Sequence, residues 1–189
     1  MSAYSLSFKN TAEILKYIKE QDIRFVDFNF TDLRGKWQHT TQHVSTITKE
    51  TLEQGVAFDG SSIAGWQDIN KSDLVMRPDL SAVTYDPFAA QKTIKVFCNI
   101  FDPISNAAYD KDPRNIAKNA ENYMMKSGLA DTAYFGPEPE FFVFDDVKYC
   151  NEPNRVFYHL DSEEGPYNSA KDYPTGNMGH RPGVKGGYL

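Results

Sequence analysis

The alternation of apolar and polar positions predicts that the chain begins with a helix. Ile14, Leu15 and Ile18 form one apolar stripe at helical spacing, so a helix is expected over residues 11–21. Asn10 stands where a side chain can cap the first turn, and an acidic residue follows three positions later, as in a capping box. The first regular element is therefore expected to be amphipathic, with one face against a core.

A strand is expected directly after this helix, over residues 23–30. Apolar Val26 and Phe28 alternate there with polar Asp27 and Asn29, which is the period of a strand with one buried face. A turn at 32–35 then predicts a hairpin. Further strands are expected over residues 36–40, 74–76, 82–85 and 93–100. One helix with several short strands indicates a small α+β domain over residues 1–110.

A second domain is predicted to begin with a well-delimited helix. Asp112 suits the N-cap, Pro113 the first helical position and Gly128 the position after the last turn. A strand is expected over 135–144, with weaker order after Val147, and the Gly- and Pro-rich residues 161–187 favour a long loop. Residues 111–189 supply too few elements for a closed core, so we expect an incomplete domain.

Composition narrows the functional classes. The 189 residues carry a net charge of −6, which disfavours a nucleic-acid partner. No segment approaches the ~20 apolar residues of a membrane span, and no secretory signal is visible. The two cysteines, Cys98 and Cys150, predict a reduced, cytoplasmic protein. The histidines follow no zinc-binding pattern.

Glu138 and Glu140 form the first candidate site, within Gly-Pro-Glu-Pro-Glu-Phe-Phe. On a strand they would project from the same face, where two carboxylates repel each other unless a cation lies beside them. Mg²⁺ and Mn²⁺ prefer such oxygen ligands. A solvated acidic turn remains an alternative. A glycosidase pair fits poorly, because its carboxylates act across a substrate bond and usually come from different elements.

Two further segments are candidates for ligand binding. Asp59, within Phe-Asp-Gly-Ser-Ser, lies in a predicted tight turn with two hydroxyl groups, and the alternative is an Asx-type turn that bonds only its own backbone. Residues 179–188 combine cationic side chains with glycine, which suits an anionic ligand, although the spacing is not that of a Walker loop. A solvated loop is an equal alternative for this segment.

Together these segments resemble one family, the bacterial-type (type I) glutamine synthetases. Residues 58–62, followed by Lys71-Ser72-Asp73 and Met76, resemble its N-terminal motif. Residues 136–142 resemble its first metal-ligand strand. The segments 177–182 and 185–188 resemble a third motif in the expected order. The resemblance spans the chain from about Thr11 onward and implies a β-grasp-like N-terminal domain followed by the truncated start of an α/β catalytic domain.

The resemblance also implies an activity, ATP-dependent ligation of ammonium to glutamate through a γ-glutamyl phosphate, with Mg²⁺ or Mn²⁺. Glu138 resembles the ligand of the nucleotide-side metal and Glu140 that of the glutamate-side metal. Asp59 resembles the carboxylate that binds and deprotonates ammonium, with Ser62 and Tyr188 lining that pocket. The partners implied are glutamate, ammonium, ATP and other copies of the subunit in a two-ring homo-oligomer, in which the Asp59 loop reaches a neighbouring subunit.

The remaining metal ligands, the arginines and most of the nucleotide site of the family are expected beyond Leu189. We therefore expect these 189 residues to be inactive alone. Two other interpretations stay open: a relative that ligates glutamate to another amine, and a non-catalytic truncated or regulatory module. A substrate panel on the full-length parent and the coding sequence downstream of Leu189 would discriminate them.

Overall fold

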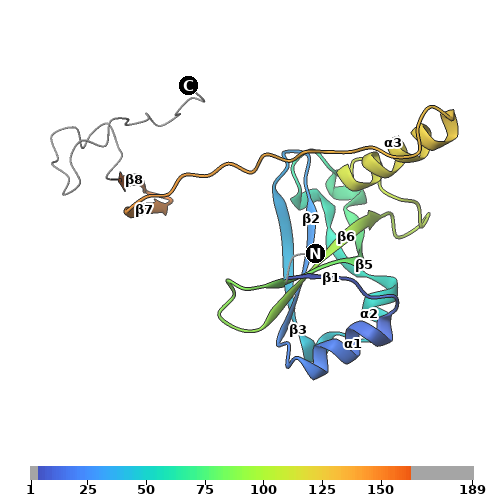
Figure 1. Cartoon of the computed structure of the whole chain (residues 1–189), viewed down its shortest axis with the longest axis horizontal. Coiled ribbons are helices and arrows are strands. Elements are labelled where there is room, and N and C mark those ends of the chain that lie inside the picture. Colours follow the sequence, from blue (N-terminus) through green and yellow to red (C-terminus); the bar gives the residue numbers. More distant parts are fainter. Residues whose placement is uncertain (1–3, 163–189) are drawn as a thin grey trace. The chain divides into compact units, whose positions relative to one another are not determined.

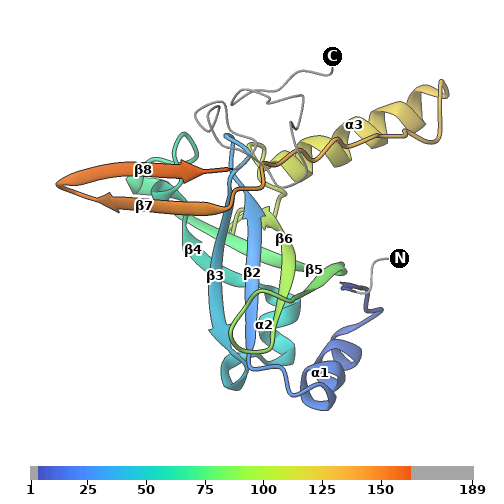
Figure 2. The same ribbon diagram turned by 60° about the vertical axis from the view of Figure 1, so that its left-hand side comes forward.

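The computed structural model describes residues 4–162 and divides the chain into two compact units, with the division between Ala133 and Tyr134. The first unit contains a six-stranded mixed sheet in the order β1-β5-β6-β2-β3, with β4 added along β5 (Figures 1 and 2). Its strands are β1 (Ser5–Leu6), β2 (Phe25–Thr31), β3 (Trp37–His43), β4 (Val56–Asp59), β5 (Asp73–Asp86) and β6 (Thr93–Phe101). Its helices are α1 (Thr11–Glu20), α2 (Lys49–Gln54) and α3 (Pro113–Ser127).

The core lies between the sheet and the helices α1 and α2, which pack on one face (Figure 1). Ile14 of α1 and Phe28 of β2 are both fully buried in it. The predicted cap is confirmed, because the Glu13 amide donates to Asn10 Oδ1 at 3.0 Å. The Asn10 cap and the apolar stripe thus fix where α1 begins and which side it buries.

The strand predictions for the first unit are largely confirmed, with two differences in extent. The hairpin strand expected over 36–40 continues to His43, because β3 pairs with β2 along its whole length. The strands expected over 74–76 and 82–85 are one long strand, β5, whose register against β6 shifts between Pro78 and Val83. Proline lacks an amide donor, which favours such an irregularity over a broken strand.

The helix α3 begins and ends where its capping residues predict. The Asp112 side chain accepts a hydrogen bond from the Arg114 amide, and Gly128 adopts the left-handed conformation at φ 72°. The apolar residues Ile116 and Tyr123 of α3 are not buried, however, since they are 52% and 76% exposed. In the described part of the chain, α3 has contacts with the sheet mainly through β6.

The prediction of a strand over residues 135–144 is wrong. Those residues form no strand, and the described part of the second unit instead contains a hairpin of β7 (Asp146–Glu152) and β8 (Arg155–Asp161), where weaker order was expected. A strand needs hydrogen-bonding partners, and no described strand pairs with 135–144; Pro137 and Pro139 also remove two amide donors. The hairpin supplies its own partner strand. None of the helices within residues 4–162 has the length and apolar character needed to cross a membrane.

Candidate functional site

The Asp59 turn is the best-defined candidate site in the first unit. β4 ends at Asp59, and a 3-10 turn follows at Gly60–Ser62. Asp59 Oδ1 accepts hydrogen bonds from the Ser61 amide at 2.8 Å and the Ser61 hydroxyl at 2.6 Å, whereas Oδ2 accepts only a longer bond of 3.3 Å from the Ser62 hydroxyl. The carboxylate is exposed, so Oδ2 has capacity for a further donor.

Gly60 is required by the packing beneath this turn. It is buried, and its amide donates to the Ser72 carbonyl at 2.6 Å. A Cβ atom at this position would lie 2.6 Å from Leu74 Cδ1 and 2.9 Å from the Ser72 oxygen. The close approach of Gly60 to β5 therefore holds Asp59 at the edge of the sheet.

The hydrogen bonds to Asp59 favour its charged form. The Ser61 hydroxyl and then the Ser61 amide lower the pKa of the carboxyl below its ordinary value, outweighing a small effect of burial. A similar Asp–Ser turn occurs at Asp102, whose Oδ1 accepts from the Ser105 amide and hydroxyl at 2.7 and 2.8 Å. The turn geometry alone therefore does not distinguish a binding site from a structural turn.

An aromatic cluster lies behind the Asp59 loop. Trp66 is 3% exposed, and its ring centroid lies 5.2 Å from those of Phe30 and Tyr109. The Trp66 indole N–H is buried without a hydrogen-bond partner among the described residues. Phe58, one residue before Asp59, joins the same cluster at 5.0 Å from Phe30. The loop is thus attached to the core at both of its ends.

The predicted carboxylate pair, Glu138 and Glu140, belongs to the second unit, and both residues are exposed. Because the segment is not a strand, the expectation that both side chains share one strand face is wrong. Neither glutamate forms an ion pair with a described lysine or arginine. Carboxylate oxygens of this kind are suitable ligands for Mg²⁺ or Mn²⁺. Residues 4–162 contain no group of three or more His, Cys, Asp or Glu side chains that could hold a metal ion.

Of the predicted site residues, the structure brings Asp59 and Ser62 together. Tyr188 lies outside the described residues, as do the segments 177–182 and 185–188. The roles predicted for Asp59, Ser62, Glu138, Glu140 and Tyr188 all stay predictions.

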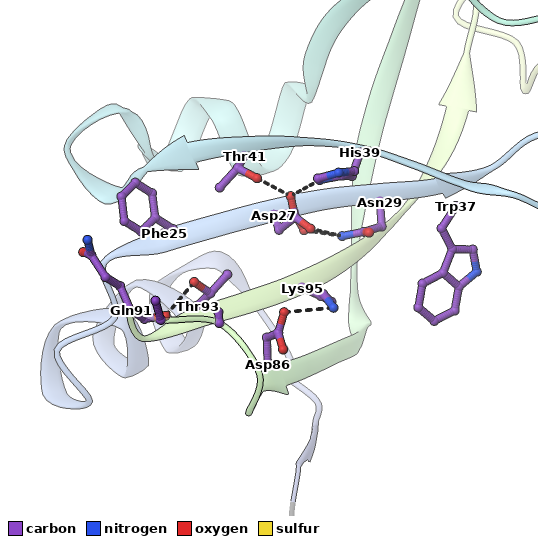
Figure 3. Close-up of a pocket in the computed structure, with 12 residues that line it drawn as sticks. Phe25, Asp27, Asn29, Trp37, His39, Thr41, Asp86, Gln91, Thr93 and Lys95 are labelled. Carbon is purple, nitrogen blue, oxygen red and sulfur yellow. Dashed lines mark hydrogen bonds and ion pairs between the residues drawn. The ribbon is translucent and has the colours of Figure 1, made fainter. Parts of the chain in front are cut away.

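A groove of about 540 Å³ on the sheet was not predicted. It lies on the face of β2 and β3 that carries Asp27 and His39 (Figure 3). Asp27, 6% exposed, accepts hydrogen bonds from His39 Nδ1 at 2.8 Å, Thr41 Oγ1 at 2.6 Å and Asn29 Nδ2 at 3.1 Å. The carboxylate orients the imidazole and leaves Nε2 as the ring nitrogen for any further bond. Alternating polar residues on the two hairpin strands were the signal that could have indicated this cluster.

Comparisons with known proteins match nearly the whole chain to glutamine synthetases. The family model of the glutamine synthetase β-grasp domain matches residues 22–103, and that of the glutamine synthetase catalytic domain matches residues 110–189. A glutamine synthetase of Azospirillum brasilense is 56% identical over 178 residues, which are 94% of this chain and 38% of that protein. A 3-hydroxylaminophenol mutase of Cupriavidus pinatubonensis is 47% identical over 181 residues, covering 96% of this chain.

A solved structure gives the same result. The cryo-EM structure of Plasmodium falciparum glutamine synthetase matches with a TM-score of 0.69 and 26% identity, covering 98% of this chain and 37% of that one. The chain spans 38% of the length of the curated glutamine synthetases of Azospirillum and Rhizobium that it matches. The chain belongs to the glutamine synthetase family and comprises its N-terminal β-grasp domain and the beginning of its catalytic domain.

Proposed function

We propose that this chain supplies part of the active site of an ATP-dependent glutamate–ammonia ligase. The observation that carries the proposal is the Asp59 turn, in which two serine hydroxyls orient an exposed carboxylate, in a chain of this family. The domains are assigned to residues 1–110 and 111–189, in a cytoplasmic protein that associates with other copies of itself. By itself the chain is expected to be inactive.

Asp59 is assigned to ammonium binding, with Ser62 and Tyr188 lining the pocket. Oδ1 already accepts two short hydrogen bonds from Ser61, so the ammonium N–H would donate to Oδ2, which Ser62 orients. The lowered pKa favours the ionised carboxylate that attracts this cation. It also makes Asp59 a weaker base, so proton transfer from ammonium requires the Ser61 bonds to loosen or the site to lose water.

Glu138 and Glu140 are assigned as Mg²⁺ or Mn²⁺ ligands on the nucleotide and glutamate sides. Their oxygen donors fit these ions, although two carboxylates alone form a weak site and further ligands must come from other residues. When bound, such ions neutralise the charge of the phosphoryl group that ATP transfers to glutamate. The part of the two glutamates of this chain would be to hold these ions.

A second candidate activity follows from the relative named 3-hydroxylaminophenol mutase, which is 47% identical over 96% of this chain. Relatives that are named for two different activities therefore match this chain closely, so its substrate has to be tested. The panel for this test includes 3-hydroxylaminophenol and primary amines in addition to ammonium, because a ligase for another amine would retain the carboxylate chemistry of Asp59.

The test is a chimera in which this chain replaces the matching segment of the Azospirillum brasilense glutamine synthetase. We expect glutamine formation that depends on ATP, glutamate and ammonium. Asp59→Asn should lower kcat/KM for ammonium by about a hundredfold. Asp102→Asn is the matched control, since Asp102 accepts similar amide and hydroxyl bonds from Ser105, and it should stay within about twofold. An active chimera that Asp59→Asn leaves unchanged would contradict the proposal.

A further inference from the structure

The loop that follows Asp59 is held by two side chains from a distant part of the sequence. The Tyr109 hydroxyl donates to the Trp66 carbonyl at 2.8 Å. Lys111 Nζ donates to the carbonyls of Gly65 and Trp66, both at 2.7 Å. Lys111 forms no ion pair with any described carboxylate, so the contacts that fix its charged end are these two backbone oxygens. Hydrogen bonds from a charged donor are stronger than neutral ones.

The segment that carries these two side chains is itself firmly attached to the sheet. The Tyr109 amide donates to the Ile100 carbonyl at 2.8 Å, and the Asp112 amide donates to the Tyr109 carbonyl at 3.1 Å. Asp112 is fully buried and accepts from the Ile100 amide at 2.9 Å while capping α3. The end of β6 and the start of α3 therefore form one support from which Tyr109 and Lys111 reach the loop.

The loop transmits this attachment to Asp59 over a short distance. The Trp66 amide donates to the Ile63 carbonyl at 3.1 Å, and the Ile63 amide donates to the Gly60 carbonyl at 3.2 Å. These two bonds connect the held carbonyls to the turn in which Ser61 and Ser62 orient the carboxylate. A shift at Gly65 or Trp66 would therefore move the turn as well.

We propose that Tyr109 and Lys111 are positioning residues for the Asp59 carboxylate, acting through the carbonyls of Gly65 and Trp66. The inference rests on the proposed function, because it takes Asp59 as the group that meets ammonium. It adds a physical link between the β-grasp domain and the segment that leads into α3. Lys111 then acts as a cationic clamp on backbone dipoles, without contact to a substrate.

Three substitutions separate this role from simple packing. Lys111→Met keeps most of the side-chain volume and removes the donor, Lys111→Arg restores a charged donor, and Tyr109→Phe keeps the ring against Trp66 without the hydroxyl. The matched control is Lys92→Met, because Lys92 Nζ likewise donates to a backbone carbonyl, that of Gln21 at 2.9 Å, away from the Asp59 loop. Any effect specific to the clamp must be absent from this control.

The first measurement is amide hydrogen exchange of Ser61 in the full 189-residue chain. Lys111→Met should accelerate it at least fivefold and Tyr109→Phe about threefold, whereas Lys111→Arg and Lys92→Met should leave it within twofold. Unchanged exchange in Lys111→Met would overturn the proposal. This readout does not depend on catalysis, so it remains informative if the chimera does not assemble.

The second measurement is steady-state kinetics in the chimera. Lys111→Met should raise KM for ammonium about fivefold with KM for glutamate unchanged, and Lys111→Arg should recover most of the loss. Faster exchange with an unchanged ammonium KM would also overturn the positioning role, provided that Asp59→Asn is impaired. If Asp59→Asn itself has no effect on ammonium, the proposed function fails, and the positioning role fails with it, while the exchange data still report whether the loop is clamped.

Discussion

Replacing the buried Asp112 should destabilise the β-grasp domain more than replacing the partly exposed Asp102. Asp112 is 0% exposed and uses both oxygens: Oδ2 accepts from the Ile100 amide at 2.9 Å and Oδ1 from the Arg114 amide at 3.0 Å. Asp112→Ala leaves the buried Ile100 N–H unpaired, at about 1–3 kcal/mol. It also removes the α3 cap, at about 0.5–2 kcal/mol. The free energy of unfolding should therefore fall by about 2–4 kcal/mol.

The assay is urea denaturation of the full chain at constant protein concentration, followed by circular dichroism and tryptophan fluorescence. Asp112→Asn should fall between wild type and Asp112→Ala, because its amide retains one acceptor oxygen. Asp102→Ala is the control: Asp102 also accepts two amide hydrogen bonds, but it is partly exposed, so water can replace it. We expect the control to lose less than about 1 kcal/mol.

The pH dependence of the stability contributed by Asp112 provides a second test of this prediction. Burial raises the pKa of the Asp112 carboxyl, so near its ordinary value the folded state binds more protons than the unfolded state. The contribution of Asp112 is therefore largest below about pH 4 and declines as pH rises through the raised folded pKa. The reasoning is refuted if Asp112→Ala loses no more stability than Asp102→Ala, or if the difference from wild type grows as pH rises.

Three smaller predictions concern other parts of the first unit. Gly60→Ala should destabilise the domain and increase Ser61 amide exchange, because its Cβ would lie 2.6 Å from Leu74 Cδ1; unchanged values would contradict this. The Lys95 hydrogen bond is the main cause that lowers the pKa of Asp86, so Lys95→Met should lose stability above about pH 4 and converge with wild type as pH falls through the lowered pKa, checked by thermal melts. Asn10→Ala should lower unfolding stability by about 1 kcal/mol, measured in urea, with Asn10→Asp retaining most of it.

The sequence predicted those parts of the fold whose signals are local. The ends of two helices are marked by the capping residues Asn10, Asp112 and Gly128, which act through hydrogen bonds or dihedral angles within a few residues. Both helices therefore begin and end close to the expected positions. The alternation in β2 likewise indicated that Val26 and Phe28 would be buried, but it did not indicate that Asp27 on the opposite face is buried as well. The segment 135–144 failed because its strand character depends on partners that no local pattern supplies.

In the candidate site too, local features were predicted from the sequence and long-range contacts were not. Asp-Gly-Ser-Ser predicted the Asp59 turn and its side-chain hydrogen bonds, which span only two or three residues. The bonds from Lys111 to the loop span 45 and 46 residues, and their partners are backbone carbonyls that carry no side-chain signature. The burial of Asp27 within a polar strand face also depended on its cross-strand neighbours His39 and Thr41.

The parallel pairing of β2 with β6 has a consequence for biosynthesis. Val26 lies opposite Ile94, so the centre of the sheet joins residues from opposite ends of the domain sequence. Such pairing has a larger entropic cost of loop closure than a local hairpin, and it therefore forms more slowly. While the ribosome is still translating the region before Thr93, the hairpin of β2 and β3 presents Val26 and Phe28 without the strand that completes their burial. Nascent chains of that length should be the species that chaperones bind.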